Sequence, residues 1–131
     1  MVIDSSAILA ILQNEPERAA FTSAIVAAPQ RRLSALSLLE VSMVIEARYG
    51  EAAQRDLELF LATAAIVVVP LNLQQVHAAL EAFRCYGKGR HPAALNLGDC
   101  CSYALAKICS APLLFKGNDF SCTDLVPAVA L

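Results

Sequence analysis

Four acidic residues stand next to apolar segments in ways that could bring their carboxylates together. Asp4 directly follows "MVI", and Asp119 follows "LLF" after a three-residue turn. Glu40 and Asp99 fall near the starts of two segments with helical patterns. The chain has 12 acidic residues, and most of the others stand in polar, surface-like surroundings. These four carboxylates, from four distant segments, are therefore the first candidates for chemistry.

A cluster of carboxylates is costly unless something neutralises it. Four such groups about 6 Å apart form six repelling pairs, each costing roughly 0.7 kcal/mol in water and about 3 kcal/mol at an effective dielectric constant of 20. The total, on the order of 4–17 kcal/mol, is comparable to the stability of a whole domain. Such a cluster persists if it is partly protonated or if a cation neutralises it. Oxygen ligands without His or Cys favour Mg²⁺ or Mn²⁺, and Mg²⁺ commonly bridges carboxylates to substrate phosphates, which indicates phosphoryl chemistry.

Each of the four acids also has a purely structural interpretation. Acidic side chains are favourable near helix N-termini, where they cap backbone N–H groups and interact with the helix dipole. Glu40 has the spacing of a capping box with Ser37, and Asp99 stands three residues after Asn96. Asp4 could likewise cap a helix, and Asp119 could belong to a turn. Taken singly these interpretations stay open, but the coincidence of four favours a shared site.

The elements around the acids predict a parallel sheet with all four carboxylates at one edge. Strand-like and helical segments alternate along the chain, which is typical of a parallel sheet covered by helices on both faces. Ligands of such sheets bind beyond the carboxyl ends of the strands, where the helices also begin. We expect strands at 1–4, 32–35, 66–70 (buried) and 112–115, a candidate fifth strand at 125–129, and helices at 5–13, 16–27, 37–49, 52–64, 72–86 and 97–109.

The composition indicates one soluble domain with apolar surface to spare. The chain has 131 residues, of which 57% are hydrophobic and only 17% charged, so we expect self-association or a protein partner. The longest apolar stretch, 59–71, is too short to span a bilayer and contains Pro70. The start, "MVIDSSA", has no basic leader, so we expect a cytoplasmic protein with no membrane association. With a net charge of −2, any nucleic acid would have to bind a local basic patch.

The five cysteines form no CxxC pair and are expected to be small, mostly buried residues in a reducing compartment. A zinc site that combines some of them with His77 and His91 is the alternative, although no spacing typical of zinc ligands is present.

Four stretches of the sequence resemble the VapC toxins, which are PIN-domain ribonucleases of bacterial type II toxin–antitoxin pairs. The stretches are "MVIDSSAILAIL" at the start, "LSALSLLEVSMVIEARYG" at 33–50, "GKGRHPAALNLGDCCSYALAK" at 87–107 and "LLFKGNDFSCTDL" at 113–125. The resemblance covers essentially the whole chain and implies a single PIN-like domain over 1–131. The implied fold class is α/β, a three-layer α/β/α sandwich with a central, mostly parallel sheet.

The resemblance also implies an activity and partners. It implies a Mg²⁺- or Mn²⁺-dependent endoribonuclease that cleaves RNA by metal-activated water. It implies a cognate VapB-like antitoxin that blocks the site, and a toxin homodimer. The acidic site of the family matches Asp4, Glu40, Asp99 and Asp119 in this chain. Our hypothesis is that the three aspartates hold the metal, while Glu40 ligates it or positions water.

Other residues are candidates for supporting roles. Ser6 could donate a hydrogen bond to a carboxylate or a phosphate, or simply belong to the first helical turn. Some family members carry a second acid where this chain has Asn118, a departure that affects position 119 most. The basic residues that could contact RNA phosphates, or form an ordinary solvated loop, are Lys88, Arg90, His91 and Lys116.

Two other functions remain open at this point. A receiver-type phosphoacceptor domain has a similar architecture and an acidic Mg²⁺ site, but it needs an Asp after its third strand, where this chain reads "VVVPLN". A catalytically silent PIN-fold binding protein would keep the fold without the activity, and the four intact acids argue against it.

Overall fold

The centre of the molecule is a parallel β-sheet. The structure is a computed structural model that describes residues 1–130, so Leu131, the last residue of the predicted domain, lies outside the described part. Within that range the sheet has four strands in the order β3-β2-β1-β4. The strands are β1 (Val2–Ile3), β2 (Arg32–Ser34), β3 (Val67–Val69) and β4 (Leu113–Leu114).

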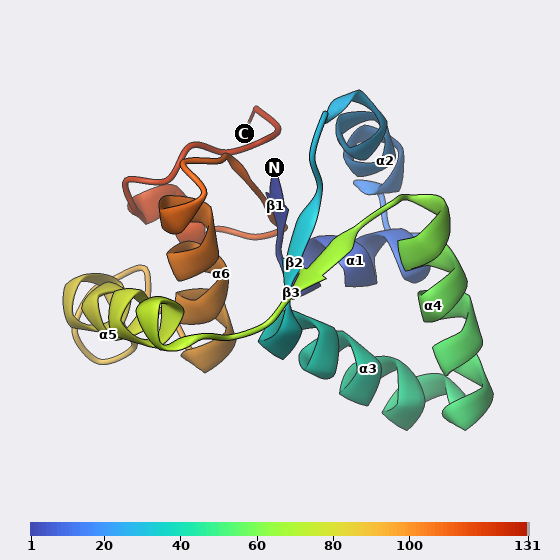
Figure 1. Ribbon diagram of the computed structural model, residues 1–131, viewed down its shortest axis with the longest axis horizontal. Helices are drawn as coiled ribbons and strands as arrows, with labels where there is room; N and C mark the ends of the chain where they lie inside the picture. Colours follow the sequence, from blue (N-terminus) through green and yellow to red (C-terminus); the bar gives the residue numbers. More distant parts are fainter. Residues whose placement is uncertain (131) are drawn as a thin grey trace.

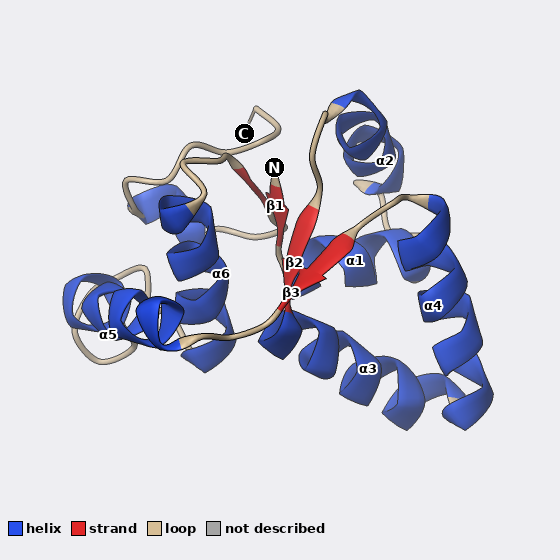
Figure 2. Cartoon of the chain, in the orientation of Figure 1, coloured by secondary structure: helices blue, strands red, loops and turns tan. Residues whose placement is uncertain are grey.

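Helices cover both faces of this sheet (Figures 1 and 2). In β1, Ile3 packs with the core of α1, α2, α3 and α4, while its neighbour Val2 packs with the core of α5 and α6. Adjacent residues of β1 therefore pack into hydrophobic layers on opposite faces of the sheet, because successive side chains of a strand point in opposite directions. The predicted three-layer α/β/α arrangement is confirmed. The helices are α1 (Ser5–Leu12), α2 (Arg18–Ala27), α3 (Ala35–Tyr49), α4 (Gln54–Thr63), α5 (Leu73–Tyr86) and α6 (Leu97–Ile108), with 3₁₀ turns at Glu51–Ala53 and Phe120–Cys122.

The strand order reverses direction at β1. The chain adds β2 and β3 on one side of β1 and then returns to place β4 on the other side. Ile3 pairs with Leu33 of β2 and with Leu114 of β4, so the three strands end at the same edge. In parallel sheets this reversal point is where ligands bind, beyond the carboxyl ends of the strands. Asp4 is the first residue after β1 and lies at this point.

The strand predicted at 66–70 is present as β3, but its predicted burial and the candidate fifth strand are wrong. The segment 66–70 was expected to be buried, but β3 is an edge strand and Val67 is 62% exposed. The candidate fifth strand at 125–129 is reduced to an isolated parallel bridge between Leu113 and Pro127. Two backbone hydrogen bonds form this bridge, from Leu113 N to Val126 O at 3.0 Å and from Ala128 N to Leu113 O at 2.8 Å.

Helix α3 starts two residues earlier than predicted. Ser34 caps it by accepting a hydrogen bond from the backbone N of Leu36 at 3.3 Å. The predicted capping box of Ser37 and Glu40 is therefore wrong, and Glu40 lies in the second turn of the helix. The other helix limits match the prediction within about two residues, the usual uncertainty of helix ends. Over residues 1–130, none of the helices combines the length and the apolar character that crossing a bilayer requires.

Candidate active site

Asp4 is buried at the carboxyl end of β1, where three donors hold its carboxylate. The side chain is only 2% exposed. Its Oδ2 accepts hydrogen bonds from the backbone N (3.0 Å) and the hydroxyl (2.6 Å) of Ser6, so Asp4 also caps α1. Its Oδ1 accepts a hydrogen bond from the Ser102 hydroxyl at 2.6 Å. Hydrogen bonds of this kind fix the orientation of the carboxylate.

Two buried serines that the sequence reasoning missed support Asp4 from below. Ser102 of α6 and Ser37 of α3 are fully buried, and their hydroxyl oxygens are 3.1 Å apart. Since the single hydroxyl proton of Ser102 goes to Asp4, Ser37 donates to Ser102. The chain Ser37–Ser102–Asp4 ties α3, α6 and β1 together. The available signal was a serine within an otherwise apolar stripe of each helix, which is costly unless the hydroxyl has a partner.

Glu40 reaches the site from the second turn of α3. Its carboxylate lies against Gly98 at the start of α6, and its Oε1 atom is buried without a hydrogen-bond partner. Burial, followed by the negative charges of Asp4 and Asp99, raises the pKa of Glu40 to about 7, although a hydrogen bond from Ser5 opposes part of the rise. Glu40 is therefore poised to gain or lose a proton near neutral pH.

Asp99 combines a capping role with a place in the acidic site. Its backbone N donates to Oδ1 of Asn96 at 2.9 Å, and its own Oδ2 accepts from the backbone N of Asn96 at 3.0 Å. This capping box fixes the first turn of α6. Burial raises the pKa of Asp99 to about 6; the hydrogen bond from Asn96 lowers it, while the charges of Asp4 and Asp119 raise it further. A carboxylate has about four acceptor positions, so capping leaves Asp99 able to bind another group.

Asp119 lies at the exposed rim of the site. It stands just before the 3₁₀ turn Phe120–Cys122 and makes no capping hydrogen bond with its side chain. Gly117 turns the chain with a φ of 100°, and the backbone O of Asn118 accepts from the backbone N of Ser121 at 3.2 Å. Buried Phe120 packs on Phe115, with ring centroids 5.1 Å apart, and anchors the return.

Asp99 interacts electrostatically with each of the other three acids. Glu40 senses Asp4 and Asp99, while Asp99 senses Asp4 and Asp119. Within residues 1–130, no three His, Cys, Asp or Glu side chains are arranged as a formed metal site. The carboxylates are thus close enough to repel without converging on one point. Their oxygen-only donor set, with the unpartnered Oε1 of Glu40, fits Mg²⁺ or Mn²⁺, which keep several waters in their coordination shell.

Lys88 lies near the start of α6. Its backbone N donates to the O of Leu95 at 3.0 Å, and Leu95 immediately precedes Asn96, the cap of α6. Its side chain lines a groove between α5 and α6 together with Leu97. Lys88 therefore lies near the N-terminus of α6, the helix whose first turn contains Asp99.

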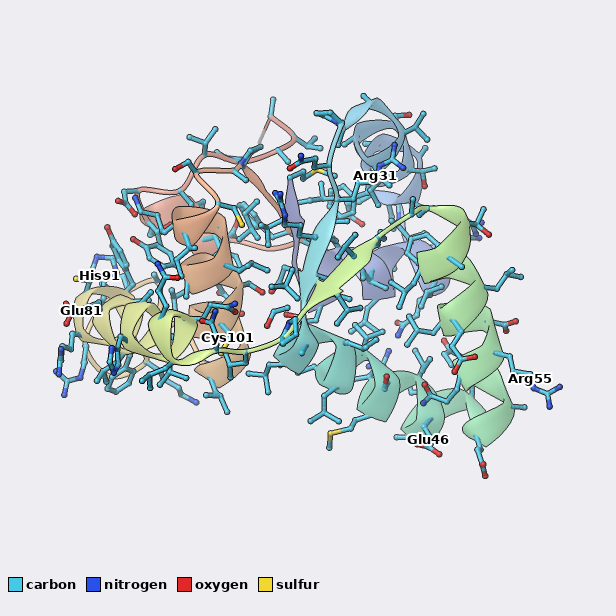
Figure 3. All side chains as sticks on the ribbon, viewed as in Figure 1. Arg31, Glu46, Arg55, Glu81, His91 and Cys101 are labelled. Atoms are coloured by element: carbon cyan, nitrogen blue, oxygen red, sulfur yellow. The ribbon has the colours of Figure 1, made fainter. Side chains whose placement is uncertain are left out.

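The other basic candidates are engaged with protein groups. The Arg90 guanidinium lies over the ring of Phe83, 4.8 Å from its centroid. His91 accepts a hydrogen bond at Nδ1 from the backbone N of Ala93 at 3.0 Å, and Figure 3 shows it at the outer edge of the molecule beside α5. These contacts hold the shape of the loop that follows α5.

The backbone of Lys116 contacts the site, whereas its ammonium group pairs with acids at the surface. Its backbone N donates to the Ser6 hydroxyl at 3.0 Å, which ties the turn before Asp119 to the start of α1. Its ammonium group pairs with Glu15, and with Glu17 at 3.3 Å. The charge of Lys116 is therefore already balanced by neighbouring acids.

Comparison with known proteins places this architecture in a family. The PIN domain family matches residues 1–125. Ribonuclease VapC30 of Mycobacterium tuberculosis is 52% identical over 125 residues, which cover 95% of each chain. Ribonuclease VapC of Mycolicibacterium smegmatis is 50% identical over 95% of this chain and 97% of its own. This chain belongs to the PIN domain family, among the VapC ribonucleases.

Solved structures support the same PIN fold. The crystal structure of Mycobacterium tuberculosis VapC20, described as a sarcin–ricin loop cleaving toxin, superposes with a TM-score of 0.76 and covers 95% of both chains at 16% identity. A toxin–antitoxin complex from Klebsiella pneumoniae gives a TM-score of 0.71, covering 99% of this PIN domain and 98% of that chain, also at 16% identity. The predicted PIN-like sandwich is confirmed by these neighbours.

Proposed function

We propose that this PIN domain is the toxin of a toxin–antitoxin pair and an endoribonuclease that cleaves RNA phosphodiester bonds. The observation that carries the proposal is the group of four acids near the reversal point of the sheet, in which Asp99 interacts electrostatically with the other three. The names of its relatives support it, since they are ribonucleases of the VapC type at 50–52% identity. A receiver-type phosphoacceptor is disfavoured by the family match and by Pro70, which follows β3 where that class needs an Asp.

We infer that the site works with Mg²⁺ or Mn²⁺. Asp4, Asp99 and Asp119 would hold the cation, and Glu40 would ligate it or position water. The support is the oxygen-only donor set and the unpartnered Oε1 of Glu40. When bound, such a cation supplies charge to polarise the scissile phosphate and lowers the pKa of water.

The chain's own residues have separate tasks in this proposal. Asp4 is held rigidly by Ser6 and Ser102, so its carboxylate has one orientation. Asp99 is oriented by the capping box at the start of α6. Glu40 presents a buried oxygen, Oε1, that has no hydrogen-bond partner and is free to accept a hydrogen bond from the attacking water.

We also propose a VapB-like antitoxin, self-association and a cytoplasmic location. Large apolar side chains are exposed on α3, α5 and α6, among them Met43 (62%), Leu73 (68%) and Leu97 (74%). Several exposed apolar residues on neighbouring elements are typical of surfaces that protein partners cover. An antitoxin, a second copy of the chain, or both would hide this surface.

A cleavage assay tests the proposed activity. The purified chain is incubated with total bacterial RNA and Mg²⁺ or Mn²⁺, and the new RNA ends are sequenced. We expect cleavage at defined positions that a chelator abolishes, and at least a hundredfold loss in Asp99→Asn, because even the partners of metal ligands contribute about 10–100-fold. A folded wild-type chain that cleaves no RNA with either ion would instead support the silent binding protein.

Neutralising Lys88 and Arg90 together should weaken RNA binding and reduce its salt dependence. Each lost phosphate contact on single-stranded RNA lowers the salt slope by about 0.7, so we expect a slope smaller by about 1.4. Fluorescence anisotropy at several salt concentrations, with Asp99→Asn in all chains to prevent cleavage, measures both quantities. Arg55→Gln is the matched control, since Figure 3 shows Arg55 beside α4 at the opposite side of the molecule. Unchanged affinity and slope in the double variant would remove this loop from the RNA site.

A further inference from the structure

Gly98 occupies a helical position that does not need a glycine for its backbone. It is the second residue of α6, with ordinary helical geometry rather than a positive φ. Glycine is among the least favourable residues in a helix, because it loses the most backbone freedom. Something other than the local conformation therefore accounts for a glycine in the first turn of α6.

The space beside Gly98 is filled by the carboxylate of Glu40. A Cβ placed on Gly98 would lie within 3.0 Å of Oε1, Oε2 and Cδ of Glu40, a separation that real Cβ atoms essentially never show. Those are its three nearest neighbours outside the local backbone, so no fixed backbone atom stands closer. The carboxylate therefore occupies the space that a side chain at position 98 would need.

The other glycines have different surroundings. Gly50, Gly89 and Gly117 have positive φ values and open space around the missing Cβ, so their backbone conformation explains them. A Cβ on Gly87 would meet the ring and carbonyl of Phe83. Among the five glycines of the chain, Gly98 is thus the one whose missing side chain makes room for an acid.

We propose that Gly98 is a positioning residue for Glu40. Without a side chain at 98, the Glu40 carboxylate can cross from α3 to the first turn of α6 and stand next to Asp99. Ser5 donates a hydrogen bond to the carboxylate, but Oε1 itself has no donor, so the fit against Gly98 and the favourable start of the α6 dipole contribute to holding the group there. The expected effect of Gly98 on catalysis rests on the proposed ribonuclease activity. Its effect on the position of the Glu40 carboxylate rests only on the contact between the two residues.

The variant Gly98→Ala tests this role. Its Cβ conflicts only with the end of a flexible side chain, so the protein should fold, with a melting temperature equal to or above that of the wild type. We expect kcat for RNA cleavage to fall by about 10–100-fold, the range found for groups that orient metal ligands, with a smaller change in KM. A crystal structure of the variant should show the Glu40 carboxylate displaced from residue 98.

A double-mutant cycle separates positioning from general damage. In a Glu40→Ala background, Gly98→Ala should change the residual rate less than twofold, because no carboxylate remains to displace. In Glu40→Asp, whose acid is one methylene shorter, the alanine should cost less than in the wild type. An equal loss in all three backgrounds would overturn the inference, and so would full activity in Gly98→Ala when Glu40→Ala is impaired.

The two proposals can fail separately. If the wild-type chain cleaves no RNA, the proposed function fails, while the crystal structure of Gly98→Ala still decides the positioning role. An unmoved Glu40 carboxylate in that structure would overturn the inference whatever the activity of the protein.

Discussion

Replacing Asp4 with Asn will reduce RNA cleavage by at least about a hundredfold and leave the fold intact. Groups that merely orient metal ligands contribute about 10–100-fold, so a direct ligand should contribute more. Asn retains the size of the side chain and caps helices as well as Asp does. The negative charge is lost, and with it one of the charges that raise the pKa values of Glu40 and Asp99.

The variant Asp4→Ala would combine a loss of activity with a loss of stability. Asp4→Ala would leave the buried Ser102 hydroxyl without its acceptor, which costs about 1–3 kcal/mol, and would also remove the cap of α1. The measurement is therefore kcat of Asp4→Asn on one defined RNA, beside a thermal melt. Asp56→Asn, an exposed acid of α4, is the control and should keep full activity. A wild-type rate in Asp4→Asn would exclude the aspartate from the catalytic site.

In the absence of divalent cations, the protein will lose stability as the pH rises from about 4 to 7. The pKa of Glu40 rises from 4.5 to about 7 on folding, and that of Asp99 rises from 3.8 to about 6. Between those values the folded state binds more protons than the unfolded state. The stability that these two carboxyl groups contribute is therefore greatest below the unfolded pKa values, falls through this window, and levels off once the pH exceeds the folded pKa of Glu40.

Added Mg²⁺ or Mn²⁺ should reverse this loss. The cation competes with protons for the same oxygens, so it should raise the melting temperature more at pH 8 than at pH 5, by on the order of 5 °C at saturation. Thermal melts at several pH values, with and without the cation, measure the effect. Glu40→Gln removes one titrating group and should flatten the metal-free profile. A profile without slope between pH 4 and pH 7, or an equal metal effect at both pH values, would contradict the coupling.

The edge where the acids meet could be predicted because it follows from local patterns and one general rule. Asp4 directly follows an apolar strand, and Asp99 carries a cap spacing with Asn96, which the structure confirms. Parallel strands share a carboxyl edge, so residues far apart in sequence could be assigned to one rim. The argument uses only the position of each acid relative to the neighbouring strand or helix in the sequence.

The details that depend on contacts between distant segments could not be predicted. Ser34 and Ser37 are both competent caps by type, and the register of β2 decides that Ser34 caps α3 while Ser37 is buried against Ser102. Gly98 resembles an ordinary helix-weakening glycine until Glu40 of another helix is seen beside it. The edge position of β3 depends on strand order, which its β-branched residues do not encode.

The central place of β1 in the sheet has a consequence for synthesis of the protein. Strand β1 pairs with β4, which follows it by more than 100 residues in the chain, since the backbone N of Val2 donates to Pro112 O and that of Asp4 to Leu114 O, both at 2.9 Å. Asp99 and Asp119 also emerge long after Asp4 and Glu40. The cluster of acids therefore cannot assemble on a nascent chain until the segment that holds Asp119 has been synthesised. For a chain proposed to cleave RNA, this order of assembly leaves incomplete products without an active centre.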